Sequence, residues 1–136
     1  MSKLISELKQ EHNEIADLFN TLMKSGVTSN KGLDIVKQSK AKLLEHLKKE
    51  DKYLYPPLYK MAEKDVLLRN TLRNFGDELE IVTQSAQRFY SKYSNMNNIN
   101  KKEFIEDMSA LNISLKSRVM KEEVSLYKAY EKLNID

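Results

Sequence analysis

The stretch that decides the fold is residues 65–93, DVLLRNTLRNFGDELEIVTQSAQRFYSKY. Its apolar residues recur at alternating steps of four and three, which places them along one side of a helix. They are Leu68, Leu72, Phe75, Leu79, Val82, Ala86, Phe89 and Tyr93. This spacing is typical of a helix that packs along the seam of a bundle, and it predicts one long helix here.

Three further segments show the same periodicity. Helices are predicted at about residues 3–23, 31–53 and 101–133. Pro56 and Pro57 are expected to break or kink the second of these before a short continuation, and its inner stripe is expected to run through Tyr53. Polar connections at 26–30 and 94–100 are short, which favours antiparallel neighbours. The predicted fold class is therefore all-α, an antiparallel up-down-up-down four-helix bundle, with residues 1–136 as a single domain.

The composition narrows the class of protein. Three glycines and two prolines in 136 residues are few for a turn-rich all-β fold. The net charge is only +3, and Lys and Arg are spread among Glu and Asp, which argues against a nucleic-acid partner. The absence of cysteine excludes disulfides, iron–sulfur clusters and thiolate metal sites. Neither a signal peptide nor an apolar run of membrane-spanning length is recognisable, so no membrane partner and a cytoplasmic location are expected.

Polar residues interrupt the apolar stripes at one level of the bundle. They are His12 on the first helix, His46 and Glu50 on the second, and Arg118 and Glu122 on the fourth. Buried polar groups are costly unless they are paired or bound to a metal. Because residues four apart share a helix face, His46 and Glu50 could contact one ion.

An internal repeat relates the two halves of the chain. HLKKEDKYLY at 46–55 aligns with RVMKEEVSLY at 118–127, and EHNEI at 11–15 aligns with ELEIV at 78–82. The chain is therefore expected to form two helix pairs related by approximate two-fold symmetry. The inner positions are His12, His46 and Glu50 in the first pair, against Leu79, Arg118 and Glu122 in the second.

A His followed by His-x-x-x-Glu, repeated in a second helix pair, resembles the hemerythrin-like HHE cation-binding family. EHNEI at 11–15, EHLKKED at 45–51 and the proline after Leu54-Tyr55 carry this resemblance, which covers nearly the whole chain. It implies two irons in the middle of the bundle, bridged by the two carboxylates, in a protein that carries dioxygen or responds to oxygen, nitric oxide or iron. The ligand set is incomplete here, because Leu79 and Arg118 stand in place of two histidines, and neither side chain coordinates a metal.

Four ligands, His12, His46, Glu50 and Glu122, carry over from the family pattern and would serve one metal. The resemblance thus implies a non-catalytic metal-binding domain with a single non-haem iron or another divalent ion. A small diatomic molecule would be its ligand, and sensing or storage its role. The alternative is a metal-free scaffold or interaction bundle, in which the forked guanidinium of Arg118 binds both Glu50 and Glu122. The sequence leaves both readings open, and it does not reveal a protein partner.

Overall fold

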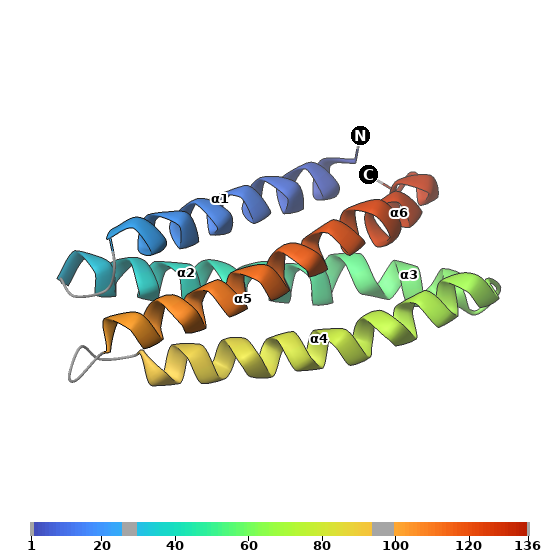
Figure 1. Cartoon of the computed structure of the whole chain (residues 1–136). Coiled ribbons are helices and arrows are strands. Elements are labelled where there is room, and N and C mark those ends of the chain that lie inside the picture. Colours follow the sequence, from blue (N-terminus) through green and yellow to red (C-terminus); the bar gives the residue numbers. More distant parts are fainter. Residues whose placement is uncertain (1, 26–29, 94–99, 136) are drawn as a thin grey trace.

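The computed structural model describes residues 2–25, 30–93 and 100–135, which form four helical rods (Figure 1). The first and third rods are α1 (Lys3–Ser25) and α4 (Val66–Lys92). The second rod consists of α2 (Asn30–Lys49), the π-helical turn η1 (Glu50–Leu54) and α3 (Tyr55–Ala62). The fourth consists of α5 (Lys101–Lys121), the π-helical turn η2 (Glu122–Leu126) and α6 (Tyr127–Leu133). The described residues contain no strand.

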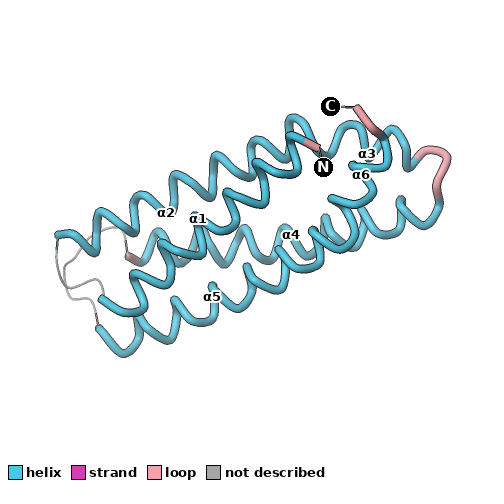
Figure 2. Tube along the Cα trace, turned by 90° about the horizontal axis from the view of Figure 1, so that it is seen from above, coloured by secondary structure: helices cyan, strands magenta, loops and turns pink. Residues whose placement is uncertain are grey.

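Successive rods run in opposite directions and pack side by side, as Figures 1 and 2 show. The predicted all-α, up-down-up-down four-helix bundle is therefore confirmed. The predicted connections at 26–29 and 94–99 lie outside the described residues. Both ends of the chain lie at the same end of the bundle, where the backbone N–H of Ser2 donates to Glu131 Oε2 at 3.4 Å.

Side-chain caps fix the beginning of the third and fourth rods. Asp65 Oδ1 accepts a hydrogen bond from the backbone N–H of Leu68 at 3.1 Å, at the start of α4. Asn100 Oδ1 accepts one from the N–H of Glu103 at 3.1 Å, at the start of α5. Each cap satisfies a donor that has no partner within the helix, which stabilises the helix by about 1 kcal/mol.

The second and fourth rods each contain a π-helical turn that the sequence analysis did not predict. In η1 the backbone N–H of Tyr55 bonds to the carbonyl of Glu50, and in η2 that of Tyr127 bonds to the carbonyl of Glu122. These bonds span five residues instead of four, so each turn holds one residue more than an α-helical turn. The extra residue changes which side chains face the core beyond it.

The α-helix of the second rod is interrupted by η1 just before Pro56 and Pro57, and the predicted short continuation follows as α3. The prolines occupy the first turn of α3, where a missing N–H is tolerated, and the widened turn precedes them. The inner stripe differs from the prediction beyond this point. Tyr53 is 49% exposed, whereas Leu54 and Tyr55 are buried, because the π turn rotates the inner face by one residue.

The hydrophobic core is divided into two clusters by a polar layer. The cluster toward the C-terminal end of α1 includes Ile15, Phe19, Leu22, Val36, Leu43, Phe89, Phe104 and Met108. The cluster toward α3 and α6 includes Ile5, Leu8, Leu54, Leu58, Leu72, Phe75, Leu126 and Tyr130. The buried polar layer between them consists of His12, His46, Glu50, Arg118 and Glu122. The predicted interruptions of the stripes therefore share one level of the bundle.

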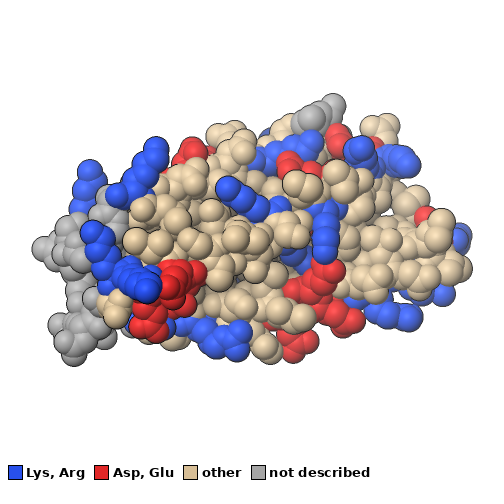
Figure 3. Space-filling model, in the orientation of Figure 1, with Lys and Arg blue, Asp and Glu red and all other residues tan. Residues whose placement is uncertain are grey.

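Charged side chains of both signs are interspersed on the face that Figure 3 shows. Some of them link neighbouring rods: the Lys92 ammonium of α4 pairs with Glu103 and Asp107 of α5, at 2.9 Å from Asp107. None of the helices in the described part of the chain has the length and apolar character needed to cross a membrane.

Candidate metal centre

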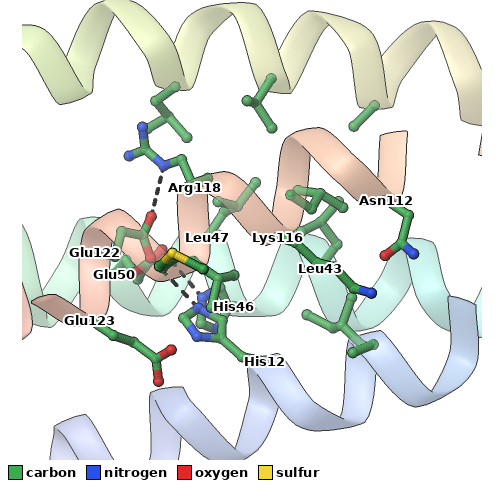
Figure 4. A pocket seen from close by; sticks show the side chains of 18 of the residues that line it. His12, Leu43, His46, Leu47, Glu50, Asn112, Lys116, Arg118, Glu122 and Glu123 are labelled. Atoms are coloured by element: carbon green, nitrogen blue, oxygen red, sulfur yellow. Dashed lines mark hydrogen bonds and ion pairs between the residues drawn. The ribbon is translucent and has the colours of Figure 1, made fainter. Parts of the chain in front are cut away.

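Four side chains with metal-binding atoms converge in the polar layer. His12 comes from α1, His46 from α2, Glu50 from η1 and Glu122 from η2. One ligand atom of each lies within 4.8 Å of those of the other three, and all four side chains are buried. Figure 4 shows them facing one another beside Arg118. These four residues, called the His/Glu cluster below, are the ones that the sequence analysis singled out.

His46 is oriented by a carboxylate on its outer ring nitrogen. Its Nδ1 lies 2.9 Å from Glu11 Oε1, and because an ionised carboxylate only accepts hydrogen bonds, Nδ1 carries a proton. In the neutral ring, Nε2 then bears the lone pair. This atom is buried without a hydrogen-bond partner and lies 3.3 Å from Glu50 Oε1. A histidine held in this way, with its other nitrogen directed at a second potential ligand, has the usual arrangement of a metal ligand.

His12 turns its Nε2 toward the carboxylates of the fourth rod. This atom lies 3.1 Å from the Tyr127 hydroxyl and 3.6 Å from Glu122 Oε2. The ring is packed between two others, with its centroid 4.5 Å from that of His46 and 5.7 Å from that of Tyr127. His12 Nδ1 is buried and has no hydrogen-bond partner. The ring is therefore held in place mainly by packing and by the bonds of Nε2.

Tyr127 lies among three members of the His/Glu cluster. Besides the contact with His12, its hydroxyl is 3.0 Å from Glu50 Oε2 and 3.2 Å from Glu122 Oε2. Burial and the two carboxylates raise the pKa of Tyr127 far above its ordinary value. The hydroxyl therefore stays protonated and donates to one of the carboxylates.

The pKa values of the two buried carboxylates are shifted in opposite directions. Burial and the charge of Glu122 raise the pKa of Glu50, although His46 acts in the opposite sense. Burial also acts to raise the pKa of Glu122, but His12 and Arg118 outweigh it and leave that pKa lowered. For His46, burial lowers the pKa, and Glu50 and Glu11 more than offset it, so the pKa is raised. A cation bound between these side chains would favour the ionised form of both carboxylates and the neutral form of His46.

Arg118 occupies the second half of the polar layer. Its Nε donates to Glu122 Oε1 at 2.7 Å, its Nη1 to the carbonyl of Phe75 at 2.8 Å, and its Nη2 to the Tyr55 hydroxyl at 2.9 Å. The predicted clamp of Arg118 on both glutamates is therefore wrong, since Glu50 bonds to Tyr127 instead. The fixed fork of the guanidinium is the reason: with Nε on Glu122, the remaining N–H groups point toward α3 and α4.

Equivalent contacts in the two halves confirm the internal repeat. Lys49 donates to Glu11 at 3.0 Å across the first helix pair, and Lys121 donates to Glu78 at 3.1 Å across the second. These are the residues that the sequence alignment placed at matching positions. The π turns η1 and η2 also begin at matching glutamates.

Sequence reasoning missed three residues of the site: Glu11, Tyr55 and Tyr127. The two tyrosines end the π turns, and each reaches into the other half, Tyr55 to Arg118 and Tyr127 to Glu50. Glu11 orients His46. All three occupy aligned positions of the internal repeat, and this alignment could have drawn attention to them. The inward direction of the tyrosines was not foreseen, because the π turns were not predicted.

The donor set fits one metal ion better than two. Two imidazole nitrogens and two carboxylates suit Fe(II) and similar divalent ions. One ligand atom of each residue lies within 4.8 Å of those of the other three, and a small inward movement would let them share one ion. An ion would also satisfy the unpartnered Nε2 of His46. In the second half Leu79 offers no donor, and the guanidinium of Arg118 places a positive charge beside Glu122.

A comparison with protein families agrees with this geometry. The family model described as the hemerythrin HHE cation-binding domain matches residues 3–130. That range includes every residue of the His/Glu cluster together with Arg118. No curated protein and no solved structure gave a significant match.

Proposed function

We propose that this chain, which belongs to the hemerythrin HHE cation-binding family, binds a single divalent metal ion through His12, His46, Glu50 and Glu122. The observation that carries the proposal is the buried, unpartnered Nε2 of His46, which faces a carboxylate while Glu11 holds the other ring nitrogen. Non-haem iron is the proposed ion, because two imidazoles with carboxylates suit Fe(II). Residues 1–136 would act as one domain, in the cytoplasm.

The proposed role is sensing or storage, without catalysis. A bound iron would have coordination positions that the four protein ligands do not fill. It would supply the binding of a small diatomic molecule at one of these positions. The chain's own residues would fix the site around it. Glu11 holds the His46 ring in position, and Tyr127 donates a hydrogen bond to a ligating carboxylate, which limits the movement of both.

A metal-free scaffold is the second candidate, and Arg118 is the observation that favours it. The guanidinium already neutralises Glu122, and its remaining bonds to Phe75 and Tyr55 complete a hydrogen-bonded core in the second half. A buried pair satisfied in this way needs no ion. In that case the hydrogen bond from Tyr127 and the contact with His46 would be the partners of Glu50.

Metal analysis of protein purified without oxygen separates these candidates. The proposal requires about one iron per chain, the scaffold requires none, and about two would contradict the assignment of Leu79 and Arg118 as non-ligands. Thermal melting adds a second readout. A bound ion at a hundred times its dissociation constant stabilises a fold by about 2.7 kcal/mol, so a chelator should lower the melting temperature of the native protein. It should have no effect on His46→Ala.

A further inference from the structure

A cavity of about 410 Å³ lies in the middle of the bundle, next to the His/Glu cluster. Its wall is formed by α1, α2, α4 and α5 and is mainly apolar, with Phe19, Leu43 and Leu47 on one side and Leu79 and Val82 on the other. Figure 4 shows the side chains around it, with the cluster at one end. The two core clusters do not fill this space.

The cavity accounts for an unexpected exposure of seam residues. The sequence predicts Leu79, Val82 and Leu115 on the inner stripes, yet all three are only half-buried, and Leu79 and Val82 belong to neither core cluster. Apolar side chains that line an unfilled space lack packing partners on that side. An apolar molecule in the cavity would supply those contacts and displace water from the wall.

The polar groups at the two ends of the cavity differ in charge. Asn112 and Lys116 of α5 lie at the end away from the cluster, while Glu123 lies near the cluster, as Figure 4 shows. Lys116 is exposed and makes no ion pair with any described residue. An ammonium and a side-chain amide together can donate hydrogen bonds to a carboxylate. The end that carries Glu123 would repel the same group.

We propose that the cavity binds a compact monocarboxylic acid with an unbranched apolar chain of about eight to ten carbons. Its carboxylate lies at Lys116 and Asn112, and its chain lies among Leu43, Leu79 and Val82. An apolar cavity of about 150 Å³ holds benzene, so the volume here suffices for such a chain. Sites of this size with few polar groups are typical of small-molecule binding. The four residues of the His/Glu cluster line one end of this cavity, but the proposed carboxylate position lies away from them (Figure 4) and binding there does not require a metal ion.

Calorimetric titration of the full chain with octanoate tests the ligand class. It is done once with a chelator and once with Fe(II), and octan-1-ol and octylamine serve as matched ligands. One octanoate is expected per chain under both conditions, with octylamine at least tenfold weaker. Binding only in the presence of iron would mean that the carboxylate coordinates the ion, and it would overturn the proposal. Equal affinity for the three compounds, or no binding of any of them, would also overturn it.

Two neighbouring residues of α4 provide a matched pair to locate the site. Val82 lines the cavity, whereas Ile81 is 64% exposed and does not line it. Val82→Trp should fill the space and weaken octanoate binding at least tenfold, while Ile81→Trp should leave it unchanged. If Val82→Trp does not fold, Lys116→Gln remains as a surface change. It should weaken octanoate about fivefold and leave octan-1-ol unaffected, and an equal effect on both ligands would place the carboxylate elsewhere.

Discussion

The bundle has two halves that share one pattern. The first half is α1 with the α2–α3 rod, and the second is α4 with the α5–α6 rod. Each half places a glutamate at the start of a π turn and a tyrosine directly after it. In both halves a lysine one residue before the glutamate pairs with a carboxylate on the adjacent helix. The inner positions are different. The first half presents two imidazoles, and the second presents a leucine and a guanidinium.

This difference shows that one backbone arrangement can hold a buried glutamate in two different electrostatic environments. Glu122 lies beside the permanent cation of Arg118, which together with His12 holds its pKa low. Glu50 has no such neighbour, and burial raises its pKa. Under the proposed function, a bound cation would be for Glu50 the partner that Arg118 is for Glu122. The predictions below exchange or remove these partners, beginning with the largest expected effect.

Converting the second half into the first should create a second metal site. In the double variant Leu79→His with Arg118→His, both halves carry a His and a His-x-x-x-Glu, and the positive charge that opposes a second cation is gone. Metal content is expected to rise from about one to about two per chain after refolding with excess Fe(II), as measured by elemental analysis. Leu79→His alone should stay at about one. A well-folded double variant with one metal or none would show that the halves are not equivalent.

Removing the guanidinium alone should destabilise the metal-free protein. Arg118→Ala leaves Glu122 buried without its cation and removes the side-chain donor to the Phe75 carbonyl, and breaking a buried pair costs about 3–5 kcal/mol. Urea unfolding measures the loss, and an added divalent ion should recover much of it. The exposed Arg88→Ala, as a control, should change stability by less than about 0.5 kcal/mol. A neutral effect of Arg118→Ala without metal would contradict the paired role of this residue.

Matched carboxylates on α1 and α4 test whether only the first half serves a metal. Glu11 bonds to both His46 and Lys49, whereas the hydrogen bonds of Glu78 come from Lys121. Loss of the partner that orients a ligating histidine typically weakens metal affinity about 10–100-fold. We therefore expect Glu11→Gln to weaken Fe(II) binding by that factor in an anaerobic titration. Glu78→Gln should leave it unchanged, and equal effects would refute the asymmetry of the halves.

The two tyrosines that cross between the halves should give the smallest effects. Tyr55→Phe removes an acceptor from Arg118, and Tyr127→Phe removes a donor from the two glutamates. Each change should cost about 1–2 kcal/mol in metal-free protein. Saturating metal should reduce the loss for Tyr127→Phe, because the ion takes over the carboxylates, but not for Tyr55→Phe. Denaturant unfolding with and without metal measures both, and rescue of Tyr55→Phe would contradict this assignment.

The sequence was sufficient for the bundle and for the members of the His/Glu cluster. The seam of residues 65–93 repeats for eight apolar positions, and a pattern of that length has few alternatives to a packed helix. His12, His46, Glu50 and Glu122 were found because each interrupts an apolar stripe. Charged or polar residues at such positions are costly, which makes them conspicuous without any structure.

Contacts that depend on side-chain direction were not predictable. Periodicity assumes a constant number of residues per turn, so the inward position was assigned to Tyr53 when η1 gives it to Tyr55. The choice of partners by Arg118 depends on the orientation of its fork, which spacing does not specify. The cavity could not be predicted from the apolar periodicity either. Leu79 and Val82 fit the spacing of core-facing residues, yet they lack packing partners on the side that lines the cavity.

The π turns also change which helix positions face the core along the second and fourth rods. One residue of an α-helix corresponds to about 100° of rotation, so an extra residue at η1 and at η2 turns α3 and α6 relative to α2 and α5. Both turns begin in the polar layer, and the two core clusters lie on either side of it. In the second and fourth rods, the core-facing positions before the π turn and those after it therefore do not follow one continuous heptad repeat. A redesign that lengthens α3 or α6 therefore has to begin a new heptad count at Tyr55 or at Tyr127. If the heptad positions were continued from α2 or α5 without this correction, leucines would face solvent and charged residues would face the core.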